Sequence, residues 1–113
     1  MGYRNAVAAI PMTNIASSAV TGTYEAINST GLPSNCSIVY IVNNSSEDVT
    51  VSYDGTHDND YVPTMTTRTL EFQTNSNPLT YQSNLAIGTK VYVKGTAGTG
   101  NVYLVGYYNA LGA

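Results

Sequence analysis

Hydrophobic and polar residues alternate along several short segments of this chain, and residues typical of turns separate these segments. The clearest alternation covers residues 90–94, and an apolar run covers residues 36–42. A period of two residues is typical of a strand with one buried face, because successive side chains of a strand point to opposite sides. No segment shows the sustained period of 3.6 residues that indicates a helix. The pattern therefore predicts an all-β chain.

We predict about eight strands, a number that suits a two-sheet antiparallel sandwich of the jelly-roll kind. Segments rich in Gly, Asn, Ser and Pro connect them, and residues 73–88 form the longest connection. The clearest predicted strands are residues 18–27, 36–42, 49–53, 61–62, 68–72, 90–94 and 101–108. In residues 68–72, Leu70 and Phe72 are expected to face the core.

Two pairs of predicted strands are consecutive along the chain and have short turns between them. Residues 36–42 and 49–53 flank a polar turn, and residues 90–94 and 101–108 flank a glycine-rich turn. Short turns of this composition join the strands of β-hairpins. We therefore predict two hairpins, with the apolar residues 36–42 as a central strand.

The chain has 113 residues, which is the length of one domain with one core. Residues 1–16 have a mixed pattern that includes Pro11, and we expect them to be an N-terminal arm or an edge strand. Residues 17–113 are expected to form the sandwich. No stretch approaches the roughly 20 apolar residues of a membrane span. The apolar run at residues 6–10 is shorter than the roughly 7–15 residues of an export signal, so we expect neither a membrane protein nor an exported one.

Charged residues make up 10% of the chain, against about 25% in typical domains. The net charge is −3, and only four residues are Lys or Arg. Nucleic-acid binding requires clustered basic residues, so this class of function is excluded. Ten residues are Tyr and none is Trp. Tyr combines a large apolar ring with a polar tip, which suits a surface that contacts other proteins.

Residues 54–60 contain three aspartates and His57, the chain's one histidine. An EF-hand requires a Glu at the last ligand position, where Met65 or Thr69 stands. We expect a solvated turn without a metal or cofactor, and an adventitious Ca²⁺ site is the alternative.

The chain lacks the residues of a catalytic centre. A triad would bring a nucleophile beside His57 and an orienting acid, but no serine stands in a nucleophile-elbow sequence. Cys36 is the one cysteine, so an intrachain disulfide is impossible. It begins an apolar run and is expected to be a buried thiol. We predict that the protein is not an enzyme.

Aromatic and apolar residues near both ends of the chain are the candidates for an interface. They are Tyr3, Arg4, Ile10, Met12, Tyr92, Tyr103, Tyr107 and Tyr108. Two alternatives remain open for the tyrosines: they fill the core, or they stack on sugar rings as in a carbohydrate-binding module.

Five segments together resemble a known family. They are residues 20–24 (VTGTY), 38–44 (IVYIVNN), 48–55 (DVTVSYDG), 88–95 (GTKVYVKG) and 100–104 (GNVYL). They resemble pieces of the small jelly-roll decoration, or cement, proteins on the capsids of tailed bacteriophages, and the resemblance covers about residues 17–108.

The resemblance implies a virion structural protein that binds the outside of the major capsid shell and stabilises it. The expected partners are the major capsid protein and further copies of the chain in a homo-oligomer. The expected location is the capsid surface, after synthesis in the host cytoplasm. The alternative is a sugar- or receptor-binding module of a phage tail or fibre.

Overall fold

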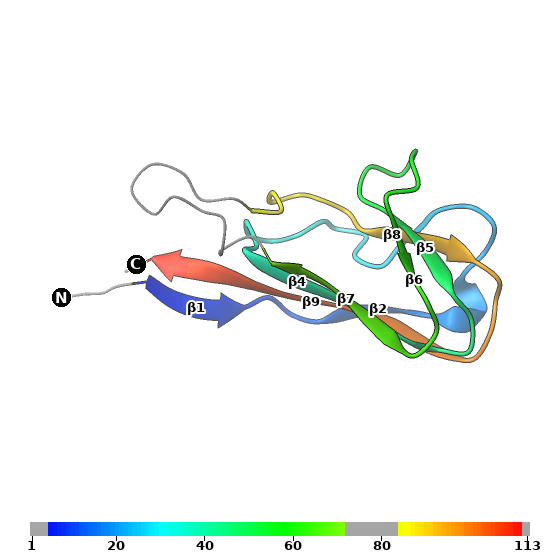
Figure 1. Ribbon diagram of the computed structural model, residues 1–113. Helices are drawn as coiled ribbons and strands as arrows, with labels where there is room; N and C mark the ends of the chain where they lie inside the picture. Colours follow the sequence, from blue (N-terminus) through cyan, green and yellow to red (C-terminus); the bar gives the residue numbers. More distant parts are fainter. Residues whose placement is uncertain (1–4, 72–83, 112–113) are drawn as a thin grey trace.

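The computed structural model describes residues 5–71 and 84–111, which form two antiparallel sheets packed face to face (Figure 1). Sheet A contains β1 (Asn5–Ala9), β2 (Thr13–Ala16), β4 (Ile38–Ser45), β7 (Thr66–Glu71) and β9 (Gly100–Leu111). Sheet B contains β3 (Glu25–Ala26), β5 (Val49–Ser52), β6 (Asp60–Val62) and β8 (Tyr92–Gly95). A short 3-10 turn, η1 (Ser17–Ala19), follows β2. The predicted all-β, two-sheet sandwich is confirmed.

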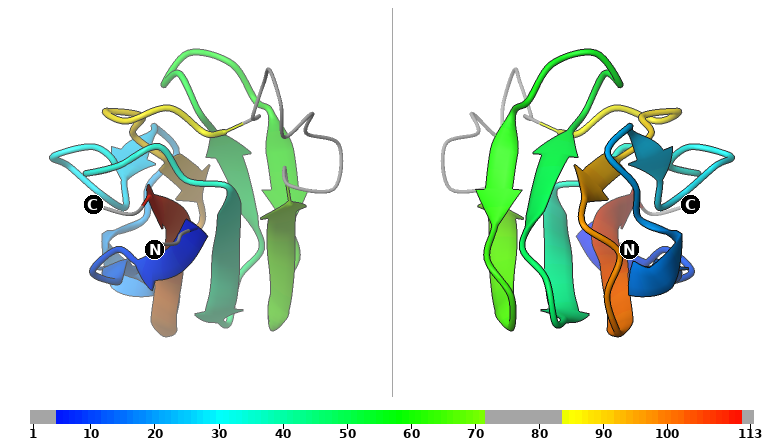
Figure 2. Two further views of the ribbon diagram at one scale, coloured as in Figure 1. Left: turned by 90° about the vertical axis from the view of Figure 1, so that its left-hand side faces the viewer. Right: turned by 90° about the vertical axis from the view of Figure 1, so that its right-hand side faces the viewer.

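The strands pair in the order of a jelly roll. β5 pairs with β6, β4 with β7, β3 with β8 and β2 with β9. The first half of the chain therefore runs antiparallel to the second half, and successive pairs belong to alternate sheets. This gives the strand orders β2-β9-β4-β7 and β3-β8-β5-β6. β1 extends the β2 edge, because it pairs with the C-terminal half of β9 (Figure 2).

Both predicted hairpins are wrong, because the strands of each expected pair lie in different sheets. β4 is in sheet A and β5 in sheet B, while β8 is in sheet B and β9 in sheet A. The two short connections cross from one sheet to the other, and they contact each other through a bond from the Ser46 N–H to the Thr99 carbonyl at 3.0 Å. Alternation reports which face of a strand is buried. It does not report which strand lies alongside, and here the partners are distant in sequence.

The core lies between the sheets and consists mainly of aliphatic side chains. Val39 and Ile41 of β4 and Leu104 of β9 are fully buried in it, as are Val51 and Val93 from sheet B. β4 lies between β9 and β7, in the central position that its apolar sequence predicts.

Two further sequence predictions concern single side chains that face this core. Cys36 is fully buried as predicted, and burial raises the pKa of its thiol. Leu70 packs against the core as predicted, whereas Phe72 lies outside the described residues. In the expected connection 73–88, only residues 84–88 are described, and Leu85 forms an isolated bridge with Cys36.

Residues 18–27 were predicted as one strand, and this prediction is mostly wrong. Only Glu25–Ala26 is a strand, and the 3-10 turn Ser17–Ala19 occupies the beginning of the segment. The Ser17 carbonyl accepts the N–H groups of Val20 and Gly98, at 3.1 and 3.2 Å. Ser and Thr side chains also compete with strand pairing by bonding to nearby backbone. These local bonds explain why most of residues 18–27 do not pair as a strand, although their sequence alternates loosely.

Candidate contact surfaces

The outer face of sheet A carries six partly exposed apolar or aromatic side chains on its two middle strands. Register places Ile38 opposite Tyr107, Tyr40 opposite Val105, and Val42 opposite Tyr103. The rings of Tyr40 and Tyr107 meet edge to face, with 6.0 Å between centroids. We call these six residues the outer apolar face: Ile38, Tyr40, Val42, Tyr103, Val105 and Tyr107.

This face differs from the usual solvated side of an antiparallel sheet. β4 and β9 contain no charged residue over their whole length. An antiparallel sheet with one face in water normally alternates apolar residues inside with polar residues outside. Strands that are apolar on both faces are typical of sheets covered on both sides. Sheet B covers the inner face of sheet A, and no described residue range forms a layer over the outer one.

The chain's own loop between β5 and β6 covers part of the outer face of sheet B, and it rises above these strands in Figure 1. Asp58 of this loop accepts a hydrogen bond from the Tyr24 hydroxyl. Its Oδ1 also forms an ion pair with Lys94 Nζ at 2.9 Å. The Lys94 ammonium also lies 4.7 Å from the centroid of the Tyr24 ring. Gly55 lies so close to Tyr92 that an added Cβ would meet its ring at 3.1 Å. The loop therefore reaches across the sheet to the β3–β8 side.

The aspartates of segment 54–60 are bonded to donors of the protein. Asp54 Oδ1 accepts the backbone N–H groups of Thr56 and His57, both at 2.9 Å, and Oδ2 lies 2.8 Å from His57 Nδ1. These bonds, the Thr56 N–H first, hold the pKa of Asp54 well below its ordinary value. The Asp54 carboxylate thus caps the turn that it begins, by accepting the backbone N–H groups that follow.

Asp60 is held in a different way from Asp54, by Tyr53 just after β5 and by Arg68 of β7 in the other sheet. It accepts the Tyr53 hydroxyl at 2.6 Å and Arg68 Nε at 3.1 Å. Burial and the bond to Asp60 raise the pKa of the Tyr53 hydroxyl. Within residues 5–71 and 84–111, no group of three or more His, Cys, Asp or Glu side chains is arranged to hold a metal ion. Asp54 thus fixes the turn from within the segment, whereas Asp58 and Asp60 tie it to residues outside the segment.

The predicted interface tyrosines are distributed over three environments. Tyr103 and Tyr107 belong to the outer apolar face. Tyr92 lies on the outer side of sheet B beneath Gly55, and Tyr108 packs against the core. Neighbouring tyrosines on β9 therefore point to opposite sides of the sheet, as alternation requires.

The interface candidates near the N-terminus also lie in different environments. Ile10 is buried in the core, while Met12 is 58% exposed at the edge of sheet A. Tyr3 and Arg4 lie outside the described residues. Tyr40, Ile38 and Val42 are not among the interface residues predicted from sequence, although their unbroken apolar run is the signal of a strand covered on both faces.

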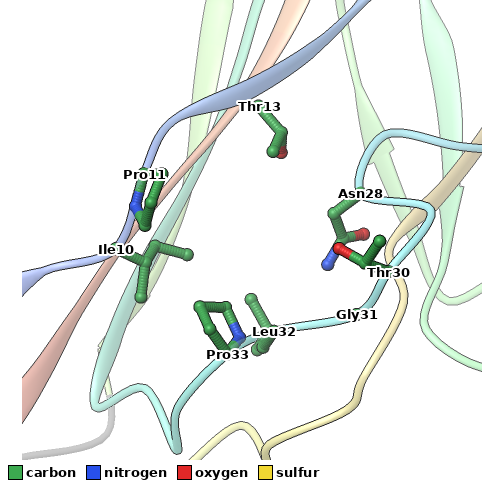
Figure 3. A pocket seen from close by; sticks show the side chains of 8 residues that line it. All are labelled: Ile10, Pro11, Thr13, Asn28, Thr30, Gly31, Leu32 and Pro33. Carbon is green, nitrogen blue, oxygen red and sulfur yellow. The ribbon is translucent and has the colours of Figure 1, made fainter.

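A cleft opens at the edge of the sandwich where β1 meets β2 (Figure 3). Ile10, Pro11 and Thr13 form one wall, and Asn28 with residues 30–33 forms the other. Its volume is about 190 Å³. Asn28 is held by bonds to the Thr89 carbonyl at 3.0 Å and from the Val91 N–H at 2.7 Å. Thr13 Oγ1 is buried and has no hydrogen-bond partner among the described residues.

No protein-family model, curated protein or solved structure matches this chain. In the part of the chain that the structure describes, no helix has the length and apolar character needed to cross a membrane.

Proposed function

We propose that this chain is a virion structural protein, a decoration protein that binds the outside of the major capsid shell of a tailed bacteriophage and stabilises it. The resemblance of its sequence segments to such proteins supports the proposal, and so does the jelly-roll strand order. The observation that carries it is the outer apolar face of sheet A, which is rich in Tyr and free of charge.

The composition of this face is that of an interface centre. Protein interfaces are depleted in charged residues at their centre and enriched in aromatic residues, with Tyr prominent. Tyr40 and Tyr107 are half-buried and combine a large ring, which contact can bury, with a polar hydroxyl. The face therefore suits a chain that is soluble alone and binds a protein surface.

A capsid presents many identical sites, and this repetition strengthens a modest contact. Further copies of the chain, in a homo-oligomer, engage neighbouring sites, and the second contact is then intramolecular. The proposed partners are thus the major capsid protein and the chain itself, on the virion surface after synthesis in the host cytoplasm. The proposal assigns the chain a binding role and no catalytic activity.

Sedimentation of purified virions tests the proposal. We expect the chain to co-purify with particles at high stoichiometry, and we expect a Tyr40→Ser, Tyr107→Ser double variant to be lost from them. The matched control is Tyr61→Ser, because Tyr61 is a 57% exposed tyrosine on the other sheet. A chain that never co-purifies with virions at high stoichiometry would refute the proposal. Equal retention of the double variant and the control would exclude the outer apolar face as the contact.

A second candidate is the sugar- or receptor-binding module of a tail or fibre. A shallow hollow on sheet B favours it, because its lining combines one exposed ring with amide, carboxylate and hydroxyl groups: Thr50, Asp58, Asn59, Asp60 and Tyr61. Tyr107 and Tyr108 cannot form one stacking platform, since they point to opposite sides of sheet A. A glycan array separates the sites. Loss of binding in Tyr61→Ala, with binding kept in Tyr107→Ala, would support this second function.

A further inference from the structure

The four edges of the two sheets differ in how they are protected from pairing with another chain. Natural edge strands are kept short, carry charges or point a charge inward. β3 has two residues and includes Glu25, and β6 has three residues and begins at Asp60. β7 carries Arg68, which points to the core side of the sheet and pairs with Asp60 at 3.1 Å. These three edges each have at least one such device.

The edge formed by β1 and β2 is protected only by Pro11, which stands in the break between the two strands and leaves β1 itself without such a device. β1 has five residues with the sequence NAVAA, and β2 has four with the sequence TNIA. Neither strand contains a charged residue or a proline. Val7, at the middle of β1, is 57% exposed. An uncharged edge of this kind is a template for a further strand.

The hydrogen-bond pattern shows which backbone groups this edge offers. The Ile10 N–H donates to the Gly106 carbonyl at 3.0 Å, whereas the Tyr107 carbonyl faces β4 and accepts the Ser37 N–H at 2.9 Å. Consecutive residues of an antiparallel strand direct their backbone groups to opposite sides. Ala8, opposite Tyr108, therefore bonds β9. It follows that Val7 and Ala9 direct their N–H and C=O groups away from the sheet.

The cleft lies beside this edge, because Ile10, Pro11 and Thr13 line it. Figure 2 places the cyan segment after β3, which forms one wall, on the side of the sandwich where β1 and β2 lie. A dry apolar cavity of roughly 150 Å³ accommodates benzene, so the cleft's volume of about 190 Å³ is enough for one large side chain. Ile10 and Leu32 give it apolar walls, and Thr13 Oγ1 adds a buried hydroxyl that has no partner among the described residues.

We propose that the β1 edge and this cleft together form a strand-addition site for an extended, uncharged segment of a partner polypeptide. The segment pairs its backbone with Val7 and Ala9 and places one apolar side chain between Ile10 and Leu32. In such recognition, main-chain bonds supply affinity and a side-chain pocket supplies specificity. The occupant is uncharged because neither β1, β2 nor the cleft lining offers a charge to pair with one. The inference does not rest on the capsid proposal, since it uses the edge of sheet A and not its outer face.

Titration of the isotope-labelled full chain with capped peptides tests the site. The probe is a peptide of alternating Thr and Val with a central Leu, and the matched peptides have Ala, Lys or Asp at the centre. We expect the Leu peptide to slow amide exchange at Val7 and Ala9 and to shift the signals of Thr13 and Gly31. Because a buried Leu side chain gains the transfer free energy that Asp cannot, the Leu peptide should bind at least about tenfold more tightly than the Asp peptide.

Two variants at adjacent exposed positions control for the location of binding. Thr30→Tyr fills the cleft, and Ser29→Tyr places the same ring just outside it. We expect the first to weaken binding of the Leu peptide at least about tenfold and the second to leave it unchanged. The proposal is overturned if no peptide of the series binds, if Leu and Asp peptides bind equally, or if Thr30→Tyr has no effect. It is also overturned if exchange at Val7 and Ala9 slows with protein concentration alone, because the occupant is then a second copy.

Discussion

Asn43 joins the two sheets through hydrogen bonds inside the core, and its removal should destabilise the fold more than any surface change. Its side chain is fully buried near the end of β4. Nδ2 donates to the carbonyls of Val62 and Glu47, both at 2.9 Å, and Oδ1 accepts the Ser45 hydroxyl at 2.5 Å. One amide thus connects β4 to β6 and to the crossing connection that follows β4.

The magnitude for Asn43→Ala follows from the groups that lose their partners. A hydrogen bond contributes about 0.5–1.5 kcal/mol net, and a buried polar group left without a partner costs about 1–3 kcal/mol. The Ser45 hydroxyl and the Glu47 carbonyl still bond each other at 3.0 Å, so their loss is partial. We therefore expect a decrease of about 3 kcal/mol in the free energy of unfolding, or roughly 12 °C in Tm for a domain of this size.

Urea denaturation and calorimetry of Asn43→Ala measure this effect. The matched control is Asn44→Ala, because Asn44 is the next residue of the same strand and is exposed. The control should stay within about 0.5 kcal/mol of the wild-type chain. If Asn43→Ala lies within about 1 kcal/mol of wild type, or if the two variants behave alike, the bonds of Asn43 do not fasten the sheets.

Three further predictions concern buried or bonded polar groups. Thr13→Val replaces a buried hydroxyl, which has no partner among the described residues, by a methyl group and should raise the free energy of unfolding by about 1 kcal/mol in urea denaturation; a loss of stability would contradict this. Cys36 should resist iodoacetamide in the native chain and react on unfolding, because burial removes access and raises its thiol pKa; rapid native labelling would refute its burial. The folded-state pKa of Asp54 lies below the value of about 3.9 in an unfolded chain, so its stabilisation is present above that pH and is lost as the pH falls towards the folded-state pKa. Asp54→Asn should therefore flatten the fall in Tm between about pH 5 and pH 2, and an unchanged slope would show that other carboxylates cause it.

Local pattern predicted most of the strands and many of their inward residues, because alternation records burial directly, but it failed for residues 18–27. Val91, Val93 and Leu70 face the core as their spacing requires. The alternation could not predict which strands pair, since pairing depends on contacts between residues that are distant in sequence. Asn28 illustrates the limit: its position beside Ser and Gly predicts a turn, yet the side chain is buried and bonds to Thr89, far along the chain.

The candidate surface was only partly predictable for a related reason. Tyr103 and Tyr107 were identified by residue type, but Tyr108 was grouped with them although alternation places neighbours on opposite faces. Tyr40 was missed because an apolar strand is ordinarily assigned to the core as a whole. The second apolar side of this strand becomes informative only because β4 and β9 belong to a sheet whose outer face no described strand covers.

The two outer faces of the sandwich differ in how far the chain's own residues contact them, and this contrast supports a contact role for sheet A. On sheet B, Asp58 bonds Tyr24 and Lys94, and Asp48 bonds the Tyr61 hydroxyl at 2.5 Å. Several polar groups on that side therefore already form hydrogen bonds within the molecule. On sheet A, the rings of the outer apolar face lie on strands without charge, and no described strand covers them. Since burial of apolar area in a partner is favourable, sheet A has the stronger physical reason to bind.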